Sequence, residues 1–236
     1  MELIFLLTTM IAGVIQGLTG FGAGIVMMMC LPMIFPLTAS AGISVCISIV
    51  LLISMVYTYK KYINLKLIIV PIVIFLSVIT MTINLSTTFD PTIMKKIFGV
   101  FLIILSIYYI FFNRNRAQKL SIPVSLFCIM VSAICDGLFG IGGPLMVLYF
   151  MSMTESIQEY LGTIQCFFLI NCIYTTTLRI FKGILLTQHI SIIIIGMIGI
   201  AIGGQLSKRL ISYLDVDLVK KLTYLMIGIS GFINIL

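Results

Sequence analysis

Charged residues are scarce in this chain of 236 amino acids. Lysine, arginine, aspartate and glutamate make up 9% of the sequence, hydrophobic residues make up 61%, and the mean hydropathy is +1.26. A water-soluble domain of this length needs far more polar surface than such a composition supplies. Tryptophan is absent, and histidine occurs once. The composition excludes an ordinary soluble protein and predicts an integral membrane protein.

The residue patterns of metal centres and of common hydrolytic sites are missing. The six cysteines lie in apolar stretches without a CxxC pair, and His189 has no HExxH or GxSxG motif beside it. A disulfide framework, a metal site and a nucleophile–base pair are therefore not indicated. We expect no enzymatic activity, no cofactor and no metal. The net charge of +7 falls in short loops, where it sets membrane orientation and predicts no nucleic-acid partner.

Apolar runs separated by short polar loops extend along the whole chain. No charged residue occurs between Leu3 and Tyr59, and further uncharged runs follow toward the C-terminus. Runs of about 20 apolar residues are typical of helices that cross a bilayer. Glu2 stands where a signal peptide would carry a basic residue, so we expect no cleaved leader. The predicted fold class is an all-α polytopic (multi-pass) membrane protein.

The two parts of the chain resemble each other. A shift of 120 positions aligns Gly17 with Gly137 and Cys46 with Cys166. Further along, a shift of 125 positions aligns the stretches DPTIMKK and DVDLVKK. The shared order of glycine cluster, apolar helices and Asp-to-Lys-Lys turn predicts two homologous halves. We place an N-terminal repeat at residues 1–113, a basic linker at 114–119 and a C-terminal repeat at 120–236, all within one integral membrane domain.

The positively charged residues distinguish two topologies. The apolar stretch after each glycine cluster has only about a dozen residues, which is short of the ~20 that a full crossing needs. If the glycine segments are re-entrant helical hairpins, ten Lys and Arg residues lie on one side and four on the other, whereas full crossings divide them eight against six. The positive-inside rule favours the hairpins, which leave three transmembrane helices in each half. An odd number of crossings makes the halves inverted repeats, and eight spanning segments stay the alternative.

Nine of the 19 glycines lie in two clusters, Gly13 to Gly24 and Gly137 to Gly143. Each glycine weakens a helix by up to about 1 kcal/mol relative to alanine, so this density predicts broken helices. Unwound backbone at membrane depth is tolerated where it is buried in protein or lines a wet cavity, and its free N–H groups suit an anion. The residues expected to bind substrate are Gly20, Phe21, Gly22, Gly24, Gly140, Ile141, Gly142, Gly143 and Pro144.

Asp136 directly precedes the second glycine turn and is remote from any basic loop. Carboxylates inside a membrane are functional by default, and two interpretations are open. Asp136 either caps the half-helix that starts near Gly142 or serves as a proton relay or gate. Gln16 occupies the matching position and cannot titrate, so a proton role would be asymmetric.

Other polar residues at membrane depth are candidates for lining a pathway or for bonding a neighbouring helix. They are Gln16, Ser44, Ser48, Gln165 and Asn171. Arg179 lies at a helix end, where its side chain either snorkels to the membrane surface or attracts an anion. The stretch GMIGIAIGG places Gly199 and Gly203 four apart, which predicts close helix packing within one protomer or in a homodimer.

The two glycine motifs resemble those of the sulfite exporter TauE/SafE family, whose members have two homologous halves that each open with such a motif. The matches are GLTGFGAG at 17–24 and GLFGIGGP at 137–144, with Thr19 and Ala23 departing from a richer glycine run. The resemblance implies a permease of the cell (inner) membrane that moves small sulfur-containing anions outward, such as sulfite, sulfoacetate or related organosulfonates.

We therefore expect a secondary transporter for a small anion that works by alternating access between its halves, with proton or ion coupling as one option. Its expected partners are the anion and the lipid bilayer. A passive anion channel and a non-transporting accessory subunit are the alternatives.

Overall fold

The computed structural model describes residues 2–86, 88, 90–112, 120–210 and 232, and the regular structure in this part of the chain is helical. The α-helices are α1 (Glu2–Thr19), α2 (Ala23–Cys30), α3 (Leu37–Tyr59), α4 (Leu65–Ser86), α5 (Pro91–Phe112), α6 (Ile122–Phe139), α7 (Gly143–Met153), α8 (Ile157–Phe181) and α9 (Ile190–Leu210). Short 3-10 helices are η1 (Leu31–Met33), η2 (Lys60–Tyr62) and η3 (Thr187–His189). The predicted linker at 114–119, the turn at 215–221 and the segment 222–236, Phe232 excepted, lie outside the described residues.

Six helices in the described part of the chain are long and apolar enough to cross a membrane, which confirms the prediction of a polytopic membrane protein. They are α1, α3 with η2, α4, α6, α8, and α9 with η3. Their outward faces carry large apolar side chains such as Ile69 and Val73 of α4, which are 60% and 61% exposed. The helices α1 and α6, which the hairpin interpretation treats as re-entrant, reach spanning length with 18 residues each. The number of crossings stays a prediction.

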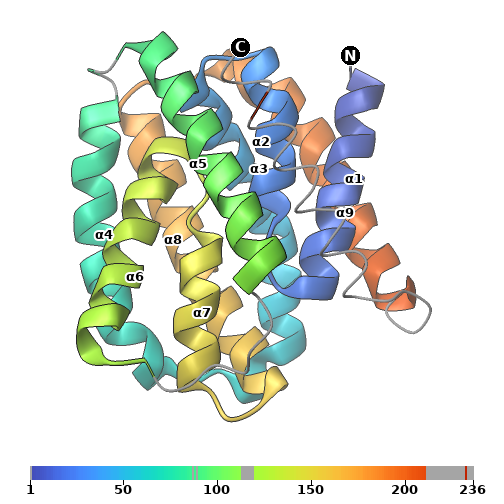
Figure 1. Ribbon diagram of the computed structural model, residues 1–236. Coiled ribbons are helices and arrows are strands. Elements are labelled where there is room, and N and C mark those ends of the chain that lie inside the picture. The colour runs from blue at the N-terminus through green and yellow to red at the C-terminus, as the bar shows by residue number, and fades with distance from the viewer. Residues whose placement is uncertain (1, 87, 89, 113–119, 211–231, 233–236) are drawn as a thin grey trace.

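The order of helices in the first half recurs in the second. Helix α6 begins 120 positions after α1 and has the same 18 residues, and α8 begins 120 positions after α3. Helix α1 packs along α9, and α6 packs along α4, so each half contributes one helix to each flank of the molecule (Figure 1). Helices α3 and α8 pack against each other between these flanks.

Glycines allow α1 and α9 to approach at backbone distance. A Cβ atom on Gly13 would lie 2.5 Å from the carbonyl oxygen of Ile200, and one on Gly203 would overlap the carbonyl oxygen of Met10. Close helix contacts of this kind need small residues on both sides. The predicted packing role of GMIGIAIGG is therefore confirmed, and the contact lies within the protomer.

An aromatic cluster joins α4, α7 and α8. The ring centroids of Phe75 and Phe167 are 5.1 Å apart, and those of Phe150 and Phe167 are 5.3 Å apart, both in edge-to-face geometry. Such pairs stabilise a core beyond their buried area. The cluster fixes the short helix α7 against two long helices and so positions the second glycine turn.

Candidate functional site

The chain leaves the helical conformation twice inside the bundle, at residues 20–22 between α1 and α2 and at 140–142 between α6 and α7. Gly20, Gly22 and Gly140 have φ angles of +84°, +105° and +66°. Residues other than glycine rarely adopt this left-handed backbone. The broken helices predicted from glycine density are confirmed.

The two glycine turns pack against each other. A Cβ atom on Gly24 would lie 2.8 Å from the carbonyl oxygen of Gly140, and a Cβ atom on Gly143 would lie 3.6 Å from Cβ of Phe21. Real Cβ atoms are not found as close to a neighbour as 2.8 Å. Glycine at position 24 therefore allows turns from the two halves to meet.

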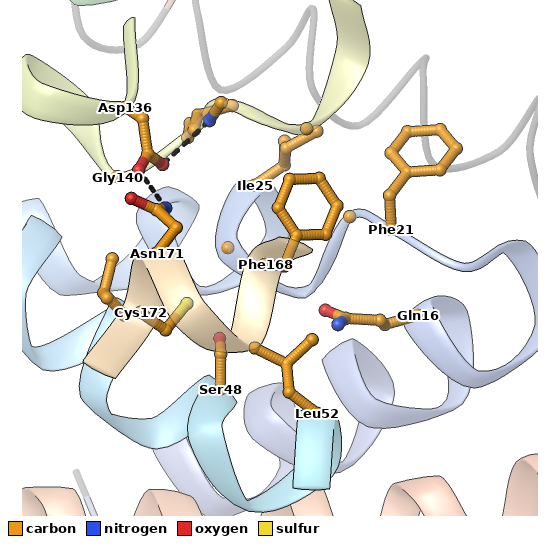
Figure 2. A pocket seen from close by; sticks show the side chains of 16 residues that line it. Gln16, Phe21, Ile25, Ser48, Leu52, Asp136, Gly140, Phe168, Asn171 and Cys172 are labelled. Carbon is orange, nitrogen blue, oxygen red and sulfur yellow. Dashed lines mark hydrogen bonds between the residues drawn. The ribbon is translucent and has the colours of Figure 1, made fainter. Parts of the chain in front are cut away.

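A cavity of about 60 Å³ lies where the turns meet. A cavity needs roughly 10–15 Å³ to hold one water molecule, so this one holds several waters or a small ion. Gln16 and Asp136 lie on opposite sides of it, with Phe168 between them (Figure 2). It is lined by Gln16, Phe21, Gly22, Gly24, Ile25, Val45, Ser48, Leu52, Asp136, Gly140, Ile141, Gly142, Gly143, Phe168, Asn171 and Cys172.

Most residues expected to bind substrate or line a pathway lie at this cavity. The exceptions are Gly20, Pro144, Ser44, Gln165 and Arg179. Pro144 lies in the first turn of α7, where the lack of an N–H is tolerated because that group has no partner within the helix. The substrate-binding role of the lining residues stays a prediction.

Gln16 and Asp136 each bind the start of the short helix in their own half. Oδ1 of Asp136 accepts a hydrogen bond from the Gly142 N–H at 2.9 Å, and Oε1 of Gln16 accepts one from the Ala23 N–H at 3.3 Å. Side-chain oxygens at helix starts satisfy N–H groups that lack a partner within the helix. Asp136 therefore makes the capping contact, and its proton role stays a proposal.

Two amides from α8 hold the two turns. Nδ2 of Asn171 donates to Oδ2 of Asp136 at 2.7 Å, and Nε2 of Gln165 donates to the carbonyl oxygen of Gly20. Gln165 thus binds the first turn from outside the cavity. Oδ1 of Asn171 has no partner among the described residues, although the side chain is only 2% exposed. An unpaired buried acceptor is costly, so this amide has an unused hydrogen-bonding capacity.

A model of the family described as Sulfite exporter TauE/SafE matches residues 5–233. The chain belongs to this family. TauE/SafE proteins are membrane transporters rather than enzymes, so the chain is a multi-pass membrane protein of the anion-exporter type. The comparisons with curated proteins and with solved structures return no match.

Arg179 of this TauE/SafE chain corrects one expectation. Its side chain is 0% exposed, so snorkelling to the membrane surface is wrong. Nη1 donates to the carbonyl oxygen of Thr38 at 3.0 Å, and Nη2 donates to that of Gly137 at 2.8 Å. Carbonyls at a helix C-terminus attract cations, so Arg179 binds the end of α6 and joins it to α3. Position near a helix end does not reveal which face a side chain occupies.

Sequence reasoning missed the apolar part of the TauE/SafE cavity wall. These residues are Ile25, Val45, Leu52, Phe168 and Cys172. Helical spacing could have identified two of them. Val45 lies three residues before Ser48 and Leu52 lies four residues after it, so all three share one helix face. Among the described residues, no three His, Cys, Asp or Glu side chains are grouped closely enough to hold a metal ion.

Proposed function

We propose that the chain exports a small sulfur-containing anion, such as sulfite or an organosulfonate, across the cell (inner) membrane, and that the anion binds in the cavity between the glycine turns. The observation that supports this proposal is the meeting of two helix starts, one from each half, at one cavity lined mainly by buried residues. Helix starts expose N–H groups and the positive end of the helix dipole, which together favour anions.

The cavity is also lined by residues at the helix starts whose N–H groups are not the ones that Gln16 and Asp136 cap. Gly24 of α2 and Gly143 of α7 lie in the first turn of their helices and line the cavity. The first four N–H groups of a helix have no acceptor within it. A tetrahedral or pyramidal oxyanion presents several acceptors to such donors, and its small volume suits a cavity of about 60 Å³.

The arrangement of the halves supports alternating access. Helix α1 descends from the N-terminus in Figure 1, whereas α6, its counterpart 120 positions later, ascends. Opposite directions are expected of inverted repeats, in which one repeat rocks against the other around a central site. The residues on either side of the cavity belong to different repeats, so such motion would open it to each side in turn.

Reconstitution into liposomes tests the transport function. Vesicles loaded with unlabelled sulfite and diluted into labelled sulfite should accumulate label transiently, because a carrier exchanges substrate across the membrane. A passive channel would instead give downhill flux without counterflow, and an accessory subunit would give no flux. Protein-free vesicles provide the background, and Glu159→Gln, which changes a partly exposed carboxylate that does not line the cavity, provides a matched protein control.

A further inference from the structure

Two opposite charges are buried beside the cavity. Asp136 is 5% exposed and Arg179 is 0% exposed. Among the described residues, Arg179 is the cation that acts on the Asp136 carboxylate, and Asp136 is the carboxylate that acts on the Arg179 guanidinium. The guanidinium is fixed by the carbonyl oxygens of Thr38, Gly137 and Asp136 at 3.0, 2.8 and 3.4 Å. This buried centre is therefore neutral when Asp136 is ionised.

An anion in the cavity would add a negative charge to this neutral centre. Burying an unbalanced charge in a low-dielectric site is strongly unfavourable. Arg179 cannot offset the added charge by taking up a proton, because an arginine side chain in a protein is already protonated. Asp136 can compensate by taking up one proton, which leaves the charge of Arg179 to balance the anion.

None of the groups around Asp136 competes with its carboxyl group as the carrier of a proton. From α8, Arg179, Asn171 and the Cys172 thiol face it, and its own helix adds Cys135. Among the described residues of α3, α4, α5 and α7, which pack against α6, no ionisable side chain acts on Asp136. Thiols are ordinarily neutral at pH 7, so neither cysteine competes for this role.

We propose, building on the transport function above, that Asp136 couples anion transport to protons and that Arg179 sets the ratio at one proton for each anion carried. Asp136 takes the proton from water on the side to which the cavity is open, the anion then binds, and both are released on the other side. Export therefore runs down an outward anion gradient that exceeds the opposing proton gradient. The site returns empty with Asp136 ionised. Transport of a monoanion is electroneutral, and a monoanion such as methanesulfonate or hydrogen sulfite is preferred over the sulfate dianion.

Asn171 can bind Asp136 in both protonation states. Its Nδ2 donates to Oδ2 of the carboxylate in this structure, whereas a protonated Oδ2 would need an acceptor. Oδ1 of the same amide has no partner among the described residues and supplies that acceptor once the amide turns over. A side chain with a donor and an acceptor on one rotating group therefore suits a carboxyl group that gains and loses a proton.

Proteoliposome transport of labelled methanesulfonate tests the coupling, because this anion does not itself titrate near neutral pH. Exchange against internal sulfite is measured first and tests the transport function alone. Accumulation is then measured under an imposed pH gradient with the membrane potential clamped by potassium and valinomycin. One-to-one coupling predicts about tenfold accumulation for each pH unit, unchanged when the potential is varied.

Asp136→Asn keeps the shape and the acceptor for the Gly142 N–H but removes the proton site. We expect this variant to lose accumulation and any exchange that remains to be independent of pH, while Glu159→Gln retains accumulation and the parental pH dependence. Accumulation by Asp136→Asn equal to that of the parent, or accumulation that follows the membrane potential, would overturn the coupling proposal. Failure of the parent to exchange either anion would instead overturn the transport function.

A second variant covers the case in which Asp136→Asn does not fold. Asn171→Leu removes a charge-assisted hydrogen bond to the ionised carboxylate, which is stronger than the neutral one that Asn171 offers the protonated form, so protonation and uptake should persist to higher pH. The pH of half-maximal methanesulfonate uptake should therefore rise relative to the parent. An unchanged or lowered midpoint would contradict the role of Asp136 as the proton carrier.

Discussion

Gln16 and Asp136, 120 positions apart, make equivalent contacts in the two halves: each side-chain oxygen accepts a hydrogen bond from an N–H group at the start of the short helix that follows. The two contacts differ in charge. A neutral amide caps α2, whereas a carboxyl group caps α7. The structural repeat therefore contains a chemical asymmetry at its centre, which places any proton-linked step in the second half.

Gln16→Glu tests this asymmetry. The variant adds a second carboxyl group to the cavity wall, and both must be protonated before an anion can bind under the proposed charge balance. We expect anion exchange near neutral pH to fall by about tenfold or more, which corresponds to at least about 1.4 kcal/mol, and to recover on acidification with a steeper pH dependence. Gln16→Met is the control, since it removes the cap without adding a charge. A Gln16→Glu profile that matches the parent would contradict the prediction.

Removal of Arg179 should destabilise the fold. Arg179→Met leaves the carbonyls of Thr38 and Gly137 without their donor and leaves Asp136 without its balancing charge, and breaking a buried pair typically costs about 3–5 kcal/mol. In the double variant with Asp136→Asn, the loss should be smaller than the sum of the single effects. Heat or denaturant unfolding of the proteins in detergent measures these losses of stability. Additive losses would show that the two charges act independently.

Alanine substitutions at the starts of the two short helices, α2 and α7, should distinguish a role in packing from a role in anion selectivity. A methyl group on Gly24 would lie 2.8 Å from the Gly140 carbonyl oxygen, so Gly24→Ala should cost about 1–3 kcal/mol and reduce exchange of every anion. Gly143→Ala has 3.6 Å to its nearest neighbour, and we expect near-parental stability with reduced exchange of larger organosulfonates. Sulfite and organosulfonate exchange, measured beside melting temperature, distinguishes these outcomes. Equal behaviour of the two variants would contradict the described contact.

The α1–α9 contact should tolerate no added methyl group. Gly203→Ala would overlap the carbonyl oxygen of Met10 and should destabilise the protein by about 1–3 kcal/mol. Ile198→Ala on the same helix is the control, because that side chain is 52% exposed and faces away from the core. Melting temperatures in detergent provide the comparison. A Gly203→Ala variant as stable as the control would contradict close packing of these helices.

The apolar helices, the two helix breaks and the importance of Asp136 could be predicted from the sequence, because each depends on a strong physical constraint. Apolar length predicted the helices, and glycine density predicted the breaks at 20–22 and 140–142, since few other residues adopt a left-handed backbone. Asp136 stood out because an isolated carboxylate in an apolar segment is expensive. These constraints are local, so one sequence suffices to detect them.

The remaining features depend on which helix faces meet in space. Nothing local to Arg179 indicates that its guanidinium binds the end of α6, because the acceptors are backbone carbonyls far away in the sequence. The cavity wall formed by Phe168 and Cys172 is equally hidden among many apolar residues. Gln165 and Asn171 were recognised as polar residues at depth, yet their partners, Gly20 and Asp136, became evident only from the fold.

The packing of α1 along α9 also constrains how the protein is made. About 170 residues separate the end of α1 from the start of α9, so at bacterial or eukaryotic synthesis rates roughly 10–35 s pass before the partner helix exists. During this interval the glycine face of α1 has no partner, while Thr9 already binds the carbonyl of Phe5 within its own helix. Insertion of the first helix and completion of its packing are therefore separate events in biosynthesis, and a ribosome that stalls before Ile190 leaves an assembly in which one flank lacks its second helix.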